Sequence, residues 1–143
     1  MYKKRRLVLS LLAVAVLVGM LVLPMTASAG RFTRENGVMW VPADLQEPMT
    51  LSVDGVSVTV PPGAMPRGGI VVLHVMREPA TGWFQVDFLP DRQFPVPVIM
   101  DFGEVFELNY MGPDGPEPII PRMPYRVRAR FLSPHFSRYS GWH

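Results

Sequence analysis

Four of the 12 carboxylates and all three histidines are considered first as side chains that could carry out acid–base or metal chemistry. Two carboxylates held close together can hydrolyse a glycosidic bond, and histidines at ligand spacing bind metal ions. The carboxylates fall on the polar faces of predicted strands or in turns, where acids serve solubility, and no histidine pair has metal-ligand spacing. These residues are Asp87, Asp101, Glu104, Glu107, His74, His135 and His143. The sequence therefore predicts no glycosidase, no metal site and no cofactor.

Three arginines recur at every second position, Arg126, Arg128 and Arg130. They alternate with smaller apolar residues, a pattern that predicts a strand with all three guanidinium groups on one face, about 7 Å apart. Such an arginine stripe either forms a solvated face that discourages edge pairing or docks an acidic partner, such as a wall polymer or another protein. Together with Trp83, an aromatic expected to be exposed, the stripe is the candidate binding face.

A hairpin is predicted around the pair Asp54-Gly55. Residues 51–53 and 56–60 alternate apolar and small polar residues on either side of this pair, and Asp-Gly accommodates the positive φ angles of a two-residue hairpin turn. Prolines in residues 61–66 then end the ladder, because proline has no amide hydrogen to donate. Asp54, Gly55 and Gly63 are therefore assigned to structural turns.

Further short strands are expected at fairly regular spacing along the chain. Residues 70–75 are nearly all apolar and predict a strand buried on both faces, and Trp40 is expected to be a core or rim aromatic. Residues 111–124 hold five prolines and are interpreted as a long connection. The predicted strands are residues 38–41, 51–53, 56–60, 70–75, 83–88, 96–102, 106–110 and 125–131, with a closing segment at 135–139.

No sustained period of 3.6 residues follows the first 29 residues, so the expected fold is all-β: a single antiparallel β-sandwich of about 7–9 short strands, after an N-terminal signal or hydrophobic helix. The shared interior is expected to contain one large set of apolar side chains. Its predicted members are Val58, Ile70, Val72, Phe84, Val86, Val98, Phe106, Val127 and Phe131.

Residues 1–29 have the three parts of an export signal. Four basic residues at positions 3–6 precede an apolar run over residues 7–23, and small residues at 27–29 form a cleavage site. We expect cleavage after Ala29; the alternative is an uncleaved anchor, since a 17-residue run is at the short limit for a membrane span. The predicted organisation is a signal at 1–29, a leader with a first short strand at 30–48, and the sandwich at 49–143.

Removal of the signal would change the charge of the chain. It would leave 10 of the 14 basic residues against all 12 acidic ones, a formal net charge of −2, so composition does not support nucleic-acid binding. The sequence contains no cysteine, which excludes disulfides and cysteine nucleophiles. We expect a secreted or envelope-associated protein, or a membrane-anchored one if residues 7–23 are retained.

Three stretches resemble the ZU-five domain of zonula-occludens proteins, ankyrins and netrin receptors, which also occurs in secreted bacterial proteins. Residues 56–66, VSVTVPPGAMP, resemble its strand followed by a "PxGA" turn. Residues 88–98, FLPDRQFPVPV, resemble its "F-x-P-D-G-x-x-F-x-x-P-V" segment, with Arg92 where glycine is usual, and residues 135–139, HFSRY, resemble the closing strand of the bacterial members. The proline-rich residues 111–124 replace a strand pair of the family.

This resemblance, over residues 51–139, implies a β-sandwich that serves as a structural or protein-interaction module, without enzyme activity. It also implies a minority alternative, because some eukaryotic proteins with this domain cut themselves at an HFS triplet, which this chain has at His135-Phe136-Ser137. In that reaction the Ser137 hydroxyl would attack the Phe136 carbonyl, His135 would move the proton and water would resolve the ester. The majority interpretation is a strand in which Phe136 packs inward and the triplet does no chemistry.

Overall fold

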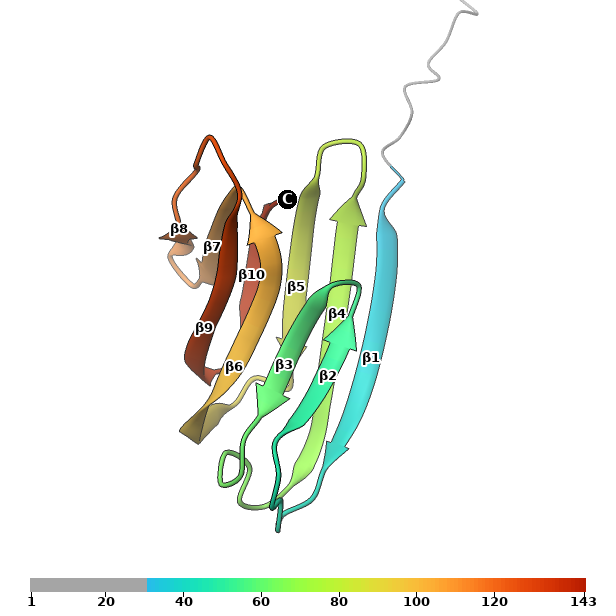
Figure 1. Cartoon of the computed structure of the whole chain (residues 1–143), viewed down its shortest axis with the longest axis vertical. Helices are drawn as coiled ribbons and strands as arrows, with labels where there is room; N and C mark the ends of the chain where they lie inside the picture. Colours follow the sequence, from blue (N-terminus) through green and yellow to red (C-terminus); the bar gives the residue numbers. More distant parts are fainter. Residues whose placement is uncertain (1–30) are drawn as a thin grey trace, which may run out of the picture. The chain divides into compact units, whose positions relative to one another are not determined.

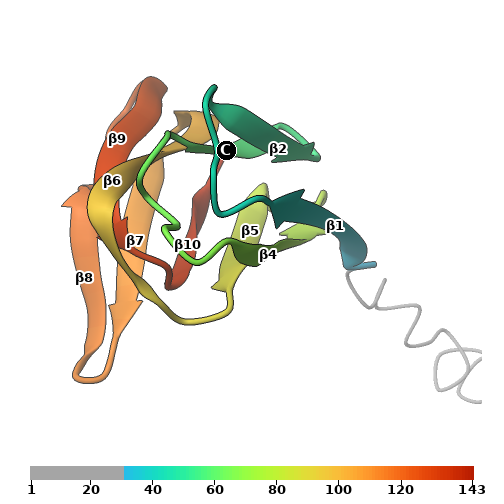
Figure 2. The ribbon, with the colours of Figure 1, turned by 90° about the horizontal axis from the view of Figure 1, so that it is seen from below.

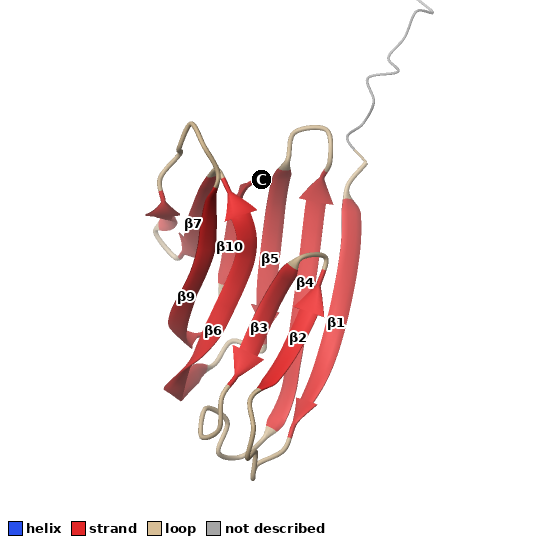
Figure 3. Cartoon of the chain, in the orientation of Figure 1, coloured by secondary structure: helices blue, strands red, loops and turns tan. Residues whose placement is uncertain are grey.

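The computed structural model describes residues 31–143, which contain ten antiparallel strands and no helix (Figure 3). The predicted signal or anchor, residues 1–29, lies outside the described residues. The strands are β1 (Thr33–Val41), β2 (Met49–Val53), β3 (Val56–Val60), β4 (Gly69–Glu78), β5 (Trp83–Leu89), β6 (Gln93–Val105), β7 (Glu107–Gly112), β8 (Gly115–Ile120), β9 (Val127–His135) and β10 (Arg138–Trp142).

The strands form two sheets in a sandwich-like arrangement (Figure 1). The six-stranded sheet has the order β1-β4-β5-β10-β7-β8, and the four-stranded sheet has the order β2-β3-β6-β9. The view from below shows β1 and β2 at one side of the two layers and β8 and β9 at the other (Figure 2). The all-β prediction is confirmed, with ten strands in place of the 7–9 expected.

The clearest differences from the predicted strands are in β1 and β8, while β6 and β9 extend beyond the ranges predicted for them. β1 begins at Thr33 rather than at Val38, because the polar residues before Val38 pair in register with β4. β8 occupies Gly115–Ile120, inside the segment interpreted as a connection. Its prolines are tolerated because β8 is an edge strand, where one row of amide groups needs no partner.

The predicted hairpin at Asp54-Gly55 is present. β2 pairs with β3 in a register that places Val53 opposite Val56, and the two turn residues have φ angles of 46° and 78°. The Asp54 carboxylate also accepts a hydrogen bond from Arg77 Nε, so the turn is tied to β4 of the other sheet. Gly63, with a φ of 84°, lies in the turn after β3, as expected.

The core lies between the sheets and is rich in aromatic rings. Phe84, Phe88, Phe102, Phe136 and Tyr139 are all nearly or fully buried. The rings of Phe88 and Phe102 both pack edge-on against Tyr139, at centroid separations of 5.8 and 5.2 Å. This aromatic cluster contributes hydrophobic stabilisation between the layers, together with the buried aliphatic side chains around it.

The predicted core was partly wrong. In β4 the buried side chains are Val71, Leu73 and Val75, while Ile70 is 43% exposed and Val72 is half-buried. An apolar run carries no alternation from which to read its phase, so only pairing with neighbouring strands decides which face is inside. Phe106, Val127 and Phe131 are half-buried rather than central, whereas Val58, Phe84, Val86 and Val98 are fully buried.

Two chain crossings between the sheets lie side by side. The segment from β5 to β6 and the segment from β9 to β10 are joined where Phe136 N donates to Arg92 O (2.9 Å) and Phe88 N donates to Ser137 O (3.1 Å). The predicted closing strand over 135–139 is therefore wrong in its first part: Phe136 and Ser137 form a corner, and β10 begins at Arg138.

Candidate functional site

The corner between β9 and β10 brings together the triplet identified in the sequence. Phe136 is fully buried, while His135 and Ser137 are half-buried on either side of it. The Phe136 ring stacks on Phe88 at 5.8 Å and meets Phe94 edge-on at 4.6 Å. The inward packing of Phe136 was expected from the sequence, and its aromatic neighbours lie on β5 and β6, on either side of the crossing between these strands.

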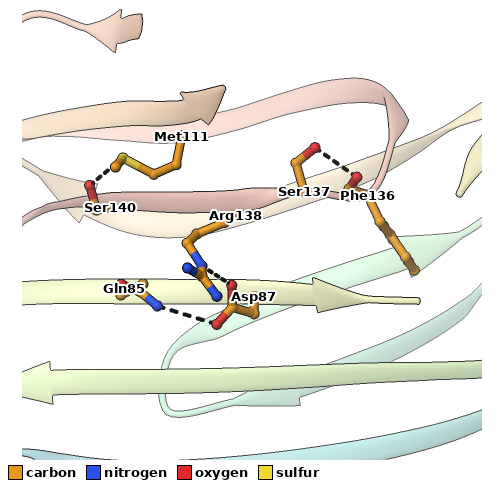
Figure 4. Close-up of polar contacts among 7 residues, drawn as sticks. All are labelled: Gln85, Asp87, Met111, Phe136, Ser137, Arg138 and Ser140. Carbon is orange, nitrogen blue, oxygen red and sulfur yellow. Dashed lines mark hydrogen bonds and ion pairs between the residues drawn. The ribbon is translucent and has the colours of Figure 1, made fainter. Parts of the chain in front are cut away.

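The polar atoms of the corner contact one another. Ser137 Oγ lies 2.7 Å from the Phe136 carbonyl oxygen and 2.9 Å from His135 Nδ1, and the first of these contacts is drawn in Figure 4. The His135 carbonyl in turn accepts a hydrogen bond of 2.7 Å from the buried Ser133 hydroxyl. The Ser137 hydroxyl is therefore adjacent to both the bond it would cleave and the base it would need.

A hydroxyl has one hydrogen, which limits how these contacts combine. If Ser137 Oγ donates to the Phe136 carbonyl, His135 Nδ1 must carry the hydrogen in its own contact and acts as a donor, not as a base. If His135 Nδ1 accepts the hydroxyl hydrogen instead, Ser137 is poised for proton removal. Among the described residues, Asp54 is the one non-glycine residue with a positive φ, so the corner shows no left-handed backbone.

A cleft of about 550 Å³ opens beside the corner. Its walls include Asp87, Tyr110, Ser137 and Arg138. Arg138 Nε donates to Asp87 Oδ1, and Gln85 Nε2 donates to Asp87 Oδ2 at 3.3 Å. Figure 4 shows these contacts on the outer face of the sheet, together with the Ser140 hydroxyl that donates to Met111 Sδ at 3.1 Å. Asp87 and Arg138 are thus paired with each other, whereas Asp91, which also lines the cleft, has no ion pair among the described residues.

The three arginines of the predicted stripe are all exposed, while Val127 and Ala129 between them are half-buried and buried. Arg126 precedes β9 and its guanidinium lies over the Phe106 ring, 5.3 Å from the centroid. Arg128 donates to Asp101 Oδ2 at 2.6 Å, and Arg130 stands opposite Asp101 in the β6–β9 register. Asp101 lies on β6, so a pattern read along β9 alone could not show that Arg128 has a carboxylate partner.

Asp101 is the carboxylate most affected by its surroundings. Burial acts to raise its pKa, but hydrogen bonds from Arg128 and from the Gly103 amide outweigh burial and hold the pKa below its usual value. The Gly103 amide donates to Asp101 Oδ1 at 2.9 Å, where β6 has a register irregularity before Glu104. Asp101 therefore stabilises the strand pairing of β6 and β9.

The other candidate acids are distributed over both sheets. Asp87 is on β5 and Glu107 on β7 of the six-stranded sheet, whereas Asp101 and Glu104 are on β6 of the four-stranded sheet. Each of the first two has a polar neighbour on its own strand, since Gln85 donates to Asp87 and Asn109 donates to Glu107. The structure does not gather them into one carboxylate site.

Trp83, His74 and His143 each make packing or hydrogen-bond contacts within the fold. Trp83 is half-buried, packs edge-on against Phe32 at 6.0 Å and stands opposite Trp142 in the β5–β10 register. His74 Nδ1 donates to the side-chain oxygen of Asn36 on β1. His143 packs on Phe84 at 4.2 Å, and burial lowers its pKa below the usual value.

An exposed apolar surface is the feature that sequence reasoning missed. Trp40 and Val38 on β1 are 67% and 65% exposed, next to Ile70 at 43% and Leu89 at 40%. In the strand register Trp40 lies opposite Ile70. Val38 lies opposite Val72, which in turn lies opposite Leu89. We call Val38, Trp40, Ile70, Val72 and Leu89 the β1 apolar face. Residues 38–41 are all apolar, so the sequence contained no alternation to show that Trp40 faces outward, and Trp40 was predicted to be a core or rim aromatic.

A cleft adjoins this face. It has a volume of about 580 Å³ and is lined by the end of β1 and the loop before β4, including Trp40, Pro42, Arg67 and Gly69. A contiguous exposed apolar patch with polar surroundings is typical of an interaction surface. The β1 apolar face and this cleft are therefore the strongest candidate for a binding site.

Comparison of the chain with family models, with curated proteins and with solved structures gave no match. Within residues 31–143, no group of three or more His, Asp or Glu side chains is placed to hold a metal ion. Over the same residues, no helix has the length and apolar character needed to cross a membrane.

Proposed function

We propose that this chain is an exported, non-catalytic interaction module at the cell surface, and that the β1 apolar face is its contact surface. The observation that carries the proposal is the exposure of Trp40 and Val38 on a strand whose other face, at Met39 and Val41, is buried in the core. A large aromatic presented to solvent on a firmly packed strand is a rigid anchor for a partner protein. The export signal read from the sequence supplies the location.

The resemblance to the ZU-five domain supports the same proposal, since that domain serves as an interaction module. The two-layer β architecture is compatible with it. The resemblance rests on residues 56–66, 88–98 and 135–139, all of which lie in or next to turns between strands. The β1 apolar face lies outside these three segments, except for Leu89.

The proposed location is tested by sequencing the N-terminus of the exported protein. We expect the chain recovered from the envelope or medium to begin at Gly30. A full-length species that stays with membranes would establish that residues 7–23 anchor the protein instead.

The contact surface is tested by retention of purified envelope proteins on the immobilised protein. Trp40→Ala is expected to abolish retention, because it removes the largest exposed apolar side chain of the surface. Leu132→Ala is the matched control, since Leu132 is 64% exposed on β9 of the other sheet. Equal retention by both variants would contradict the assignment of the surface.

Binding to an acidic wall polymer was the alternative drawn from the arginine stripe and Trp83. The pairing of Arg128 with Asp101 and the stacking of Arg126 on Phe106 leave this alternative with less support. Salt-sensitive binding to isolated envelope polymer that is lost in an Arg126/Arg128/Arg130→Ala variant would restore it.

Self-cleavage at the corner is the second candidate, favoured by the 2.9 Å contact between His135 Nδ1 and Ser137 Oγ. Ser137 Oγ would bond to the Phe136 carbonyl carbon while the Phe136–Ser137 amide bond breaks, the hydroxyl proton passing through His135 to the released amine. Water would then hydrolyse the ester to a Phe136 carboxylate and restore the serine hydroxyl. Intact mass spectrometry decides: a fragment ending at Phe136, absent from Ser137→Ala, would establish cleavage, and one intact mass after long incubation would exclude it.

A further inference from the structure

The four sheet edges of the described residues differ in how they resist pairing with another strand. β8 contains Pro116 and Pro118, and β9 contains Arg128, Arg130 and Pro134, all of which discourage strand addition. The β2 edge is only five residues long. β1 has nine residues, no proline and no lysine, and its charged residues, Arg34 and Glu35, are confined to its first half. β9 is also nine residues long, so β1 shares the greatest edge length and is the least protected of the four edges.

The side chains of β1 also favour an added strand. On the inner side Met39 and Val41 are buried, and a Cβ at Gly37 would lie only 2.5 Å from Val53 of β2, so the strand is held against the core. On the outer side the β1 apolar face continues across β4 and β5 and reaches the open edge at Val38 and Trp40. An apolar surface that ends at a free sheet edge is extended by the next strand of a continuing sheet.

We propose that the partner of the β1 edge is β1 of a second copy of this chain, paired antiparallel about a two-fold axis at Gly37. Gly37 is the midpoint of Thr33–Val41, so this register is the one that pairs all nine residues. A two-fold axis makes such an interface self-complementary. The inference rests on the proposed interaction function and names the partner of that surface.

The outer-face side chains fit this register. In it Arg34 of each copy stands opposite Trp40 of the other, and Asn36 stands opposite Val38. Arg34 is exposed and has no ion-pair partner among the described residues, so its guanidinium is free to lie over the indole ring, the strongest aromatic partner for a cation. The contact occurs twice per dimer, and the two six-stranded sheets become one continuous sheet.

The lack of native cysteines allows a direct test with the full-length chain. Directly opposed residues of antiparallel strands have Cα atoms about 4.5–5.5 Å apart, a separation that a disulfide spans. We expect an equimolar mixture of Asn36→Cys and Val38→Cys proteins to form a mixed disulfide dimer under mild oxidation, several-fold faster than either variant forms a homodimer. A mixture of Arg34→Cys and Trp40→Cys should form its mixed disulfide in the same way. This second pair replaces the first if Asn36→Cys disturbs β1 by removing the hydrogen bond between Asn36 and His74.

The control mixture pairs Val38→Cys with Leu132→Cys. The two positions are equally exposed, at 65% and 64%, so random collisions crosslink them as readily as Val38 crosslinks to itself. The inference would be overturned if neither β1 cysteine pair formed the mixed disulfide faster than the control mixture does. A Val38→Lys variant that sediments as a monomer, beside a Leu132→Lys variant that keeps the dimer mass, is the second expected result.

The outcome separates this inference from the function on which it rests. A chain that is monomeric at every concentration tested, yet retains another purified envelope protein through Trp40, overturns self-pairing and leaves the interaction function standing. A monomer with no Trp40-dependent retention overturns both. A dimer that forms with increasing protein concentration and is crosslinked by the β1 cysteine pairs supports both self-pairing and the interaction function.

Discussion

The corner at His135-Phe136-Ser137 and the β1 apolar face are opposites in what they present to solvent. The corner contains the residue types of catalysis, but its ring is buried among aromatics and its polar atoms contact one another. The face has no reactive group, yet it exposes Trp40 and Val38 more than any other pair of neighbouring apolar residues on its sheet. The stronger candidate surface is therefore marked by the exposure of its side chains to solvent rather than by their chemical type.

The largest effect is expected from the buried ring of the corner. Phe136→Ala should lower the free energy of unfolding by about 3–5 kcal/mol, because it removes the ring that joins Phe88 and Phe94 and leaves a cavity. Chemical denaturation measures this loss. The exposed Leu132→Ala control should change stability by less than about 0.5 kcal/mol, and a Phe136→Ala protein as stable as that control would refute a structural role for the corner.

The inner side of β1 should be the next most sensitive position. Gly37→Ala is expected to cost about 1–3 kcal/mol, because the new methyl group would lie 2.5 Å from Val53 Cγ2 and 3.0 Å from Leu51 Cδ1. A double-mutant cycle with Val53→Ala checks the cause. The double variant should lose less than the sum of the two single losses; strict additivity would show that β1 does not pack on β2 as described.

The stability of the protein should depend on pH through Asp101, which lies on β6 beside the β9 edge strand. Its pKa is lowered in the folded state, so its stabilising contribution is present above the unfolded pKa of about 4 and is lost as pH falls below it. We expect Asp101→Asn to reduce stability at pH 7 by about 1 kcal/mol and to flatten the decline between about pH 5 and 3. Thermal melting over that range tests this, and parallel curves for both proteins would contradict it.

The smallest effect on stability is expected at the exposed face itself. Trp40→Ala should change the free energy of unfolding by less than about 0.5 kcal/mol, because the side chain is two-thirds exposed, while it should abolish association. Denaturation and sedimentation of the same preparation measure both effects. A large loss of stability would place Trp40 with Phe136 as a core residue and remove the contrast between the two regions.

Local patterns were sufficient for much of the architecture. The Asp54-Gly55 turn, the strand alternation of residues 83–88 and the absence of helical periodicity predicted the hairpin, β5 and the all-β class. These features depend on φ preferences and side-chain period, which neighbouring residues alone determine. The inward packing of Phe136 was also expected, although the corner around it was predicted as a strand.

Only the tertiary structure decided which residues are available. Ile70 and Val72 were predicted inside because an apolar run has no readable phase, and pairing with β1 and β5 turned them outward. Arg128 is paired because Asp101, 27 positions away, lies on the adjacent strand. Trp40 is exposed because β1 is the edge of its sheet with no strand over its outer face among the described residues. Exposure and charge pairing are set by contacts between distant segments, and a pattern along one segment does not contain them.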